Sequence, residues 1–280
     1  MALKQSQTIS LLDINRDDFN RVRDSARRFR SVYCGSSILK DNIFFSIRNY
    51  IRKEGRNPEM LFFPFRDEEK SAITFIREDS VFLCINTELT LSEEIYAAAN
   101  RTWKILSYIE NESSRGLFSV LKSGENDDAE LNSENLEADV FAGLLLVPDS
   151  LLSETAEFYD IELANPGMHD LLRISALFAV PFRTAVTRLY ECGFIPKERA
   201  FVFLNTPNEK ILGAAKNYGI GRIWHLSGAG TESLGSFIEN FNFNVEHDFL
   251  TEGRKREGTD FLKEFGEMFP EFSHLDDSPL

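Results

Sequence analysis

The stretch Ile85–Leu106, INTELTLSEEIYAAANRTWKIL, passes from a β-rich run into a helix and organises the whole chain. Its segment Thr90-Leu-Ser-Glu93 has the S/T-x-x-E pattern of a capping box, in which two side chains satisfy backbone N–H groups of the first helical turn. We therefore expect a helix that runs from this segment to about Ile109. The residues on its core side recur at helical spacing: Ile95, Ala98, Thr102, Ile105, Leu106 and Ile109.

The opposite side of this helix carries Asn100, Lys104 and Ser107. Residues three and four positions apart lie on one face of a helix, so these polar side chains are expected to lie together. The sequence thus predicts a helix with one face toward the core and one polar face.

A small β-sheet is expected immediately before this helix. Three short runs are rich in β-branched and aromatic residues, and charged turns with the sequences RDEEK and REDS separate them. The runs are Met60–Phe65, Ala72–Ile76 and Val81–Ile85. Such short connections favour hairpins, so we predict a three-stranded antiparallel sheet. Residues 13–53, in front of the sheet, have helical spacing and are predicted to form N-terminal helices.

A second long helix is expected after residues 122–135, which form an acidic polar linker. It is predicted from about residue 133 to 147 and ends at Pro148, because proline lacks the backbone N–H that a helix interior needs. Glu137 lies three, four and seven positions before apolar residues of this helix, so its carboxylate points in the same direction as they do. A carboxylate in such surroundings needs a partner.

Two further helices are predicted within residues 171–200, on either side of the turn Ala179-Val-Pro181, and they resemble a helix-turn-helix. Five cations face two anions in this range, in contrast to the acidic chain as a whole. Contact with nucleic acid would have to use Arg183, Thr187 and Arg188. The alternative is a packing module with an exposed basic stripe, which the many apolar residues of the second helix favour.

The composition is that of a globular protein. The chain has 280 residues, of which 42% are hydrophobic and 27% charged, which argues against a disordered or fibrous chain. The 31 basic and 45 acidic residues give a net charge of -14, which repels nucleic acid and anionic membranes. No apolar run approaches the roughly 18 residues of a membrane span. The three cysteines are widely separated and form no disulfide framework, so we expect a cytoplasmic protein. The negative charge and the lack of a long apolar run lead us to expect no membrane binding.

Two motifs resemble those of the ImmA/IrrE family of zinc metallopeptidases. In that family a strand ending in I-N leads into a helix with the pattern A-H-E-L-x-H, and the stretch that begins at Ile85 has the same layout. A later helix of the family carries E-A-[ND]-x-F-A-x-x-L-L-[MV]-P, and EADVFAGLLLVP at residues 137–148 matches nearly every defined position. The run ISALFAVPFRTAVTRLYECGFI at 174–195 is similar to the helical segment that follows the peptidase core. The resemblance covers about residues 40–200.

The resemblance implies an α+β fold in which zincin-like helices pack on the small sheet. We accordingly predict an ImmA/IrrE-like pseudopeptidase domain with N-terminal helices over residues 1–150 and a helical, helix-turn-helix-like module over 151–200. Residues 201–280 are predicted to be a C-terminal extension of unknown class, which begins with the strand-like run FVFL.

The positions at which the family binds zinc carry other residues here. The family pattern places two histidines as zinc ligands and a glutamate as general base, and the matching residues are Asn100, Lys104 and Arg101. Asparagine is a poor zinc ligand, a protonated lysine is none, and arginine cannot accept a proton. Only Glu137, which resembles the third ligand, is retained. We therefore expect no catalytic residue, no cofactor and no metal site.

A change of this kind leaves Glu137 without the charge of a metal ion. A partly buried and uncompensated carboxylate costs about 3 to 5 kcal/mol. Lys104 or Arg101 can supply the missing positive charge, so we predict an ion pair between Glu137 and one of them in the former metal position, with Asn100 hydrogen-bonded beside it. The alternative is that both cations point into solvent.

Three functions follow as hypotheses. The first is a catalytically inactive pseudopeptidase that acts as a protein-binding or regulatory module, and the resemblance implies a helix-turn-helix repressor as its partner. The acidic chain would attract such a basic protein. The alternative is an active zinc metallopeptidase, a metalloendopeptidase that cleaves a transcriptional repressor through ligands not identified in the sequence. The third is a DNA-binding regulator that acts through residues 171–200.

Overall fold

The structure is a computed structural model of the chain, and it describes residues 14–65, 70–77, 79–110, 118–121, 128–220, 234–235 and 237–268. The chain divides into two compact units, Met1–Ser233 and Leu234–Leu280. The predicted parts 1–150 and 151–200 therefore lie in one unit, together with the first residues of the predicted extension. This unit contains both helices and strands, which confirms the α+β class. No helix in the described part of the chain is long and apolar enough to cross a membrane.

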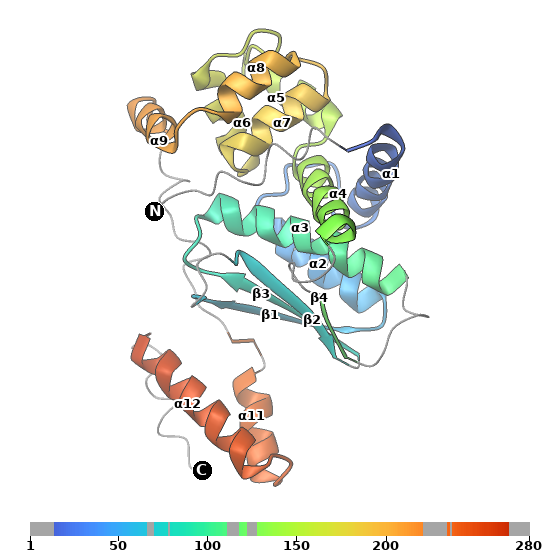
Figure 1. Cartoon of the computed structure of the whole chain (residues 1–280), viewed down its shortest axis with the longest axis vertical. Coiled ribbons are helices and arrows are strands. Elements are labelled where there is room, and N and C mark those ends of the chain that lie inside the picture. The colour runs from blue at the N-terminus through green and yellow to red at the C-terminus, as the bar shows by residue number, and fades with distance from the viewer. Residues whose placement is uncertain are drawn as a thin grey trace. The chain divides into compact units, whose positions relative to one another are not determined.

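The first unit contains a four-stranded sheet (Figure 1). Its strands are β1 (Asn57–Phe63), β2 (Ala72–Arg77), β3 (Ser80–Asn86) and β4 (Phe118–Leu121), in the order β1-β3-β2-β4. β2 runs antiparallel to both β3 and β4, whereas β1 runs parallel to β3.

The prediction of three antiparallel strands is wrong in two respects. The short turn between β2 and β3 does make an antiparallel hairpin, with Arg77 opposite Ser80. β1, however, pairs in parallel with β3, with Pro58 opposite Val81, so a charged connection between β1 and β2 did not indicate a hairpin. The fourth strand, β4, extends the sheet beyond β2 through a segment for which no strand was predicted.

Helices pack on this sheet in two layers (Figure 1). α3 (Leu91–Glu110) packs against β2 and β3, and α2 (Asn42–Lys53) packs against β1 and α3. α4 (Asp128–Leu146) packs on α3, and α1 (Arg16–Tyr33) packs on α4. The Glu93 half of the predicted capping box of α3 is present, because the backbone N–H of Thr90 donates to Glu93 Oε2 at 2.9 Å. The Thr90 hydroxyl donates to the same carboxylate oxygen at 2.7 Å, and the backbone N–H of Glu93 bonds the carbonyl of Thr90.

The predicted polar face of α3 does not point to solvent. Arg101 and Lys104 are only 8% and 3% exposed, since α4 covers this side of the helix. The alternative in which both cations point into solvent is therefore wrong. The amphipathic wheel identified the core residues of α3 correctly but gave no sign that a second helix packs on the other face.

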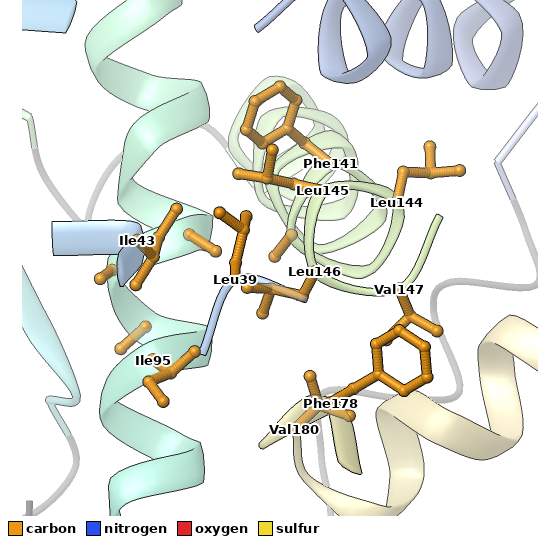
Figure 2. Close-up of a cluster of buried hydrophobic side chains, with 14 of the residues drawn as sticks. Leu39, Ile43, Ile95, Phe141, Leu144, Leu145, Leu146, Val147, Phe178 and Val180 are labelled. Carbon is orange, nitrogen blue, oxygen red and sulfur yellow. The ribbon is translucent and has the colours of Figure 1, made fainter. Parts of the chain in front are cut away.

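The core is continuous from the sheet-covering helices into the helices that follow α4. Figure 2 shows Leu39 between Ile43 and Leu146, and Val147 next to Phe178. All five side chains are buried. Buried side chains at the end of α4 thus pack both against the helices on the sheet and against the helices that follow α4 in the chain.

Five helices follow α4 within the described residues of the first unit. They are α5 (Asp149–Phe158), α6 (Met168–Phe178), α7 (Phe182–Glu191), α8 (Lys197–Leu204) and α9 (Asn208–Asn217). α6 and α7 are the predicted helix pair, and the chain turns between them at Ala179 with a left-handed φ of 52°. The run FVFL lies in α8, so its strand-like interpretation is wrong. Pro196 is the N-cap residue of α8. Proline is tolerated at the start of a helix because its missing N–H would have no partner within the helix there.

Among the described residues of the second unit are two helices, α11 (Phe237–Glu246) and α12 (Glu252–Met268). Phe241 of α11 is buried, and a Cβ atom at Gly258 of α12 would lie 2.2 Å from its ring. The glycine therefore allows the two helices to approach closely. The class of residues 201–280 was left open by the sequence, and their described part contains α9 in the first unit and α11 and α12 in the second.

Candidate functional site

The residues singled out on α3 and α4 meet where these two helices pack. Asn100, Arg101 and Lys104 lie on α3 and Glu137 lies on α4, and the two helices are in direct contact. The structure therefore brings the two helices that carry these residues together. The contacts within the pair involve further residues that the sequence analysis did not select.

The carboxylate of Asp139 is the centre of this site. Asn100 Nδ2 donates to Asp139 Oδ1 at 2.8 Å, and the Tyr96 hydroxyl donates to the same oxygen at 3.1 Å. Asp139 is 7% exposed. We refer to Tyr96, Asn100 and Asp139 as the amide cluster. The sequence analysis expected Asn100 to be hydrogen-bonded beside an ion pair of Glu137, and the acceptor that the structure shows for Asn100 is Asp139.

Burial dominates the electrostatics of the amide cluster. It raises the pKa of Asp139 to about 6, against the lowering effect of the two hydrogen bonds. The positive charges of Lys104 and Arg101 also lower this pKa. The pKa of the Tyr96 phenol is raised well above its ordinary value by burial and by the negative charge of Asp139. The phenol consequently stays protonated and acts as a hydrogen-bond donor.

Lys104 and Glu137 each have a partner from another part of the fold. Lys104 Nζ donates to Asn135 Oδ1 at 2.7 Å, which ties α3 to α4. Glu137 forms an ion pair with Arg21 of α1, and the guanidinium of Arg21 also lies 5.6 Å from the centre of the Trp103 ring. The predicted pairing of Glu137 with Lys104 or Arg101 stays a prediction.

These residues do not fit a zinc ion. Protein zinc sites are built from thiolate, imidazole and carboxylate ligands. Here the Glu137 carboxylate lies against Arg21, the Asn100 amide nitrogen faces Asp139, and Lys104 is a cation. In the described part of the chain, no three His, Cys, Asp or Glu side chains are grouped as a metal ion would require.

A second polar cluster is centred on Arg188 of α7, whose side chain is 1% exposed. It forms ion pairs with Asp149 of α5 and Glu191 of α7, and its Nε donates to Val147 O at 3.0 Å. A Cβ atom at Gly143 would lie 3.1 Å from Arg188 Cδ, so the glycine leaves room for the arginine stem. We call Arg188, Asp149 and Glu191 the arginine cluster.

The predicted nucleic-acid contacts on α7 are wrong for two of the three residues. Arg188 and Thr187 are both about 1% exposed and cannot reach a nucleic acid in this fold. Arg183 is half-buried, and its Nε donates to Leu204 O at 3.3 Å. Other cations of this module also bond backbone carbonyls, as Arg199 does with Pro166 O at 2.8 Å. The local positive charge therefore serves helix packing in large part.

Cysteine chemistry is not favoured in the helical module. The pKa of the Cys192 thiol is raised to about 12, mainly by burial and also by the nearby Asp149 and Glu191 carboxylates, against the lowering effect of Arg188. A thiol of this kind is not a nucleophile at neutral pH.

Comparisons with known proteins identify no family. No protein-family model and no curated protein matches the chain. Among solved structures the chain is similar to a Mycobacterium tuberculosis transcriptional regulator, with 16% identity and a TM-score of 0.36. The match covers 61% of this chain and 51% of that regulator, so it spans about half of the regulator's length. A likeness at this level carries no argument about fold or function.

The structure reveals functional candidates that sequence reasoning missed. Asp139 occupies the [ND] position of the motif that contains Glu137, so the motif itself was a signal for it. Arg21 and Glu191 had no such signal. Arg21 lies 116 positions from Glu137, and Glu191 stood out only as one of the two anions in a basic range.

Proposed function

We propose that this chain is a catalytically inactive relative of the ImmA/IrrE metallopeptidases that works as a protein-binding or regulatory module. The observation that supports this proposal most directly is the bonding of Asn100 to Asp139 and of Lys104 to Asn135. Both α3 residues at the histidine positions of the family motif are engaged in tying α3 to α4. The site has thus become part of the scaffold.

The proposed partner is a helix-turn-helix repressor, by analogy with the substrates of active relatives. The net charge of -14 supports a basic partner, because opposite charges speed encounter and favour the complex. Binding to such a domain should weaken as salt is added, since exposed charges are screened. Binding that does not respond to salt would contradict this choice of partner.

Zinc content tests the loss of the catalyst. We expect substoichiometric zinc in untagged wild-type protein purified without chelator and measured by elemental mass spectrometry. The matched variant carries Asn100→His, Arg101→Glu and Lys104→His, and a second version adds Arg21→Ala to free Glu137 from its ion pair. Both versions should retain more zinc than the wild type, the second the most.

The opposite result has a definite meaning. Near-stoichiometric zinc in the wild type, together with metal-dependent cleavage of a repressor, would overturn the proposal in favour of an active metalloendopeptidase. Circular dichroism of each variant shows whether the scaffold is folded, so a failure to bind zinc is not confused with unfolding.

A further inference from the structure

A hollow of about 680 Å3 opens beside the arginine cluster, between the start of α1 and the turn from α7 to α8. Its walls are largely apolar, with Ile14 and Phe19 from the N-terminal side and Phe194 and Ile195 from the turn. Glu191 is one of its lining residues. The volume lies within the roughly 300 to 1,000 Å3 that is usual for ligand sites.

The carboxylate of Glu191 is only half satisfied by the protein. Its side chain is 6% exposed, and Oε2 is held by Arg188. The other oxygen, Oε1, is buried and has no hydrogen-bond partner among the described residues. Arg188 cannot supply a second bond easily, because it also serves Asp149 and Val147 O. A buried acceptor without a donor is costly, so a donor that reaches this oxygen from the hollow is stabilised.

We propose that this hollow binds a basic side chain of a partner protein, with its ammonium or guanidinium group donating to Glu191 and its stem lying between Phe19 and Phe194. Charged donors form the strongest hydrogen bonds to carboxylates, and lysine and arginine stems pack readily on apolar surfaces. The inference rests on the proposed protein-binding function, because a side chain presented by a protein is chosen here over a free amine.

The second charged residue of the hollow acts in the opposite direction. Arg16 also lines it and is exposed at the start of α1. Its cation repels a second cation in the hollow. Removal of the Arg16 charge should therefore strengthen binding, whereas removal of the Glu191 charge should abolish the preference for a cation.

Two capped dipeptides test the inference. The first is N-acetyl-phenylalanyl-arginine amide, and the second replaces arginine by citrulline, which has the same shape without the charge. Each is titrated into the full-length 15N-labelled protein, and the amide shifts of Gly193 and Ile195 are followed by NMR. We expect the arginine peptide to bind about fivefold tighter or more, as a charged rather than a neutral donor meets the carboxylate.

The variants locate the effect. Glu191→Gln should give equal affinities for the two peptides, and Arg16→Gln should tighten binding of the arginine peptide only. Because Glu191 also holds Arg188, a second variant is needed that does not touch the arginine cluster. Ile14→Trp fills the hollow from its partly exposed side and should remove the shifts for both peptides.

Three results would overturn the inference: equal affinities of the wild type for the two peptides, shifts that map away from the hollow, or tighter binding of benzylamine than of the arginine peptide. The last would assign the hollow to a free amine. These outcomes are separate from the zinc test. A zinc-free wild type that does not discriminate the peptides refutes this inference and leaves the proposed function standing.

Discussion

The amide cluster and the arginine cluster are two buried polar groupings in the same unit, and they solve the problem of burial differently. In the arginine cluster one guanidinium meets two carboxylates and a backbone carbonyl. In the amide cluster one carboxylate, Asp139, meets two neutral donors. A cation therefore offsets the burial of charge directly in the first cluster and only from a distance in the second.

The protonation equilibria record this difference for Asp149, although burial still raises the pKa of Glu191 against the charge of Arg188. Burial alone would raise the pKa of Asp149, but the charges of Arg188 and Arg27, together with the hydrogen bonds from Arg188 and Cys192, outweigh burial and the pKa is lowered. For Asp139 burial prevails, and its pKa rises to about 6. The arginine cluster thus holds α7 to α5 and to the end of α4 through bonds that depend on the charge of Arg188. In the amide cluster, between α3 and α4, burial disfavours the charged form of Asp139.

The largest effect should follow from Arg188→Met. The substitution keeps much of the side-chain volume but leaves the buried Glu191 carboxylate and the carbonyl of Val147 without their donor. We expect a loss of about 3 to 5 kcal/mol in the free energy of unfolding, as for other broken buried ion pairs. Urea unfolding followed by circular dichroism measures this loss.

Arg183→Met is the matched control on the same helix. Arg183 is half-buried and makes one hydrogen bond, to Leu204 O, so its loss should cost about 1 kcal/mol. A similar cost for both variants would show that Arg188 is no special anchor and would remove the distinction between the two clusters.

Asp139→Asn should change stability in a pH-dependent manner. The folded pKa of Asp139 is about 6, against 3.8 for an ordinary aspartate, so the folded chain binds the proton more tightly than the unfolded chain. The stabilising effect of this protonation is complete below about pH 4 and is lost as the pH rises through 6. Relative to the wild type, the variant should therefore gain up to about 3 kcal/mol between pH 4 and pH 7.

The test is the difference in unfolding free energy between variant and wild type at several pH values. The value at pH 4 serves as the internal reference, because Asp139 is then protonated and resembles asparagine. A difference that is constant from pH 4 to 7 would mean that ionisation of Asp139 does not destabilise the folded state. The contrast with Asp149 would then fail.

The sequence indicated much of the fold because the relevant signals are local. The capping box at Thr90 and the helical spacing after it predicted α3, and Pro148 marked the end of α4. The β-rich runs were found, but their pairing was not, since strand order depends on contacts between distant segments. The run FVFL shows the same limit, because four apolar residues fit a strand and a helix equally well.

The site was predictable only where a motif covered it. Asn100, Lys104 and Glu137 were found because the motif positions fix them, and Asp139 lies within the same motif. Arg188 was misread, since a cation in a basic range gives no sign that it will be buried. Its burial depends on Gly143, 45 positions earlier in the chain, and no local pattern links the two.

The smallest expected effect concerns α1, which places one arginine beside α4 and another beside the arginine cluster. Arg21 pairs with Glu137 and stacks on Trp103, whereas Arg27 lies 3.7 Å from Asp149, which Arg188 already holds. Both arginines are more than half exposed, so solvent screens their ion pairs.

Arg21→Ala should cost about 1 kcal/mol in the free energy of unfolding, because it removes an ion pair and a cation–π contact together. Arg27→Ala should cost less than about 0.5 kcal/mol, because Asp149 retains its buried partner. Thermal unfolding of the two variants in parallel measures the difference, and a larger cost for Arg27→Ala would mean that the arginine cluster depends on its exposed rim.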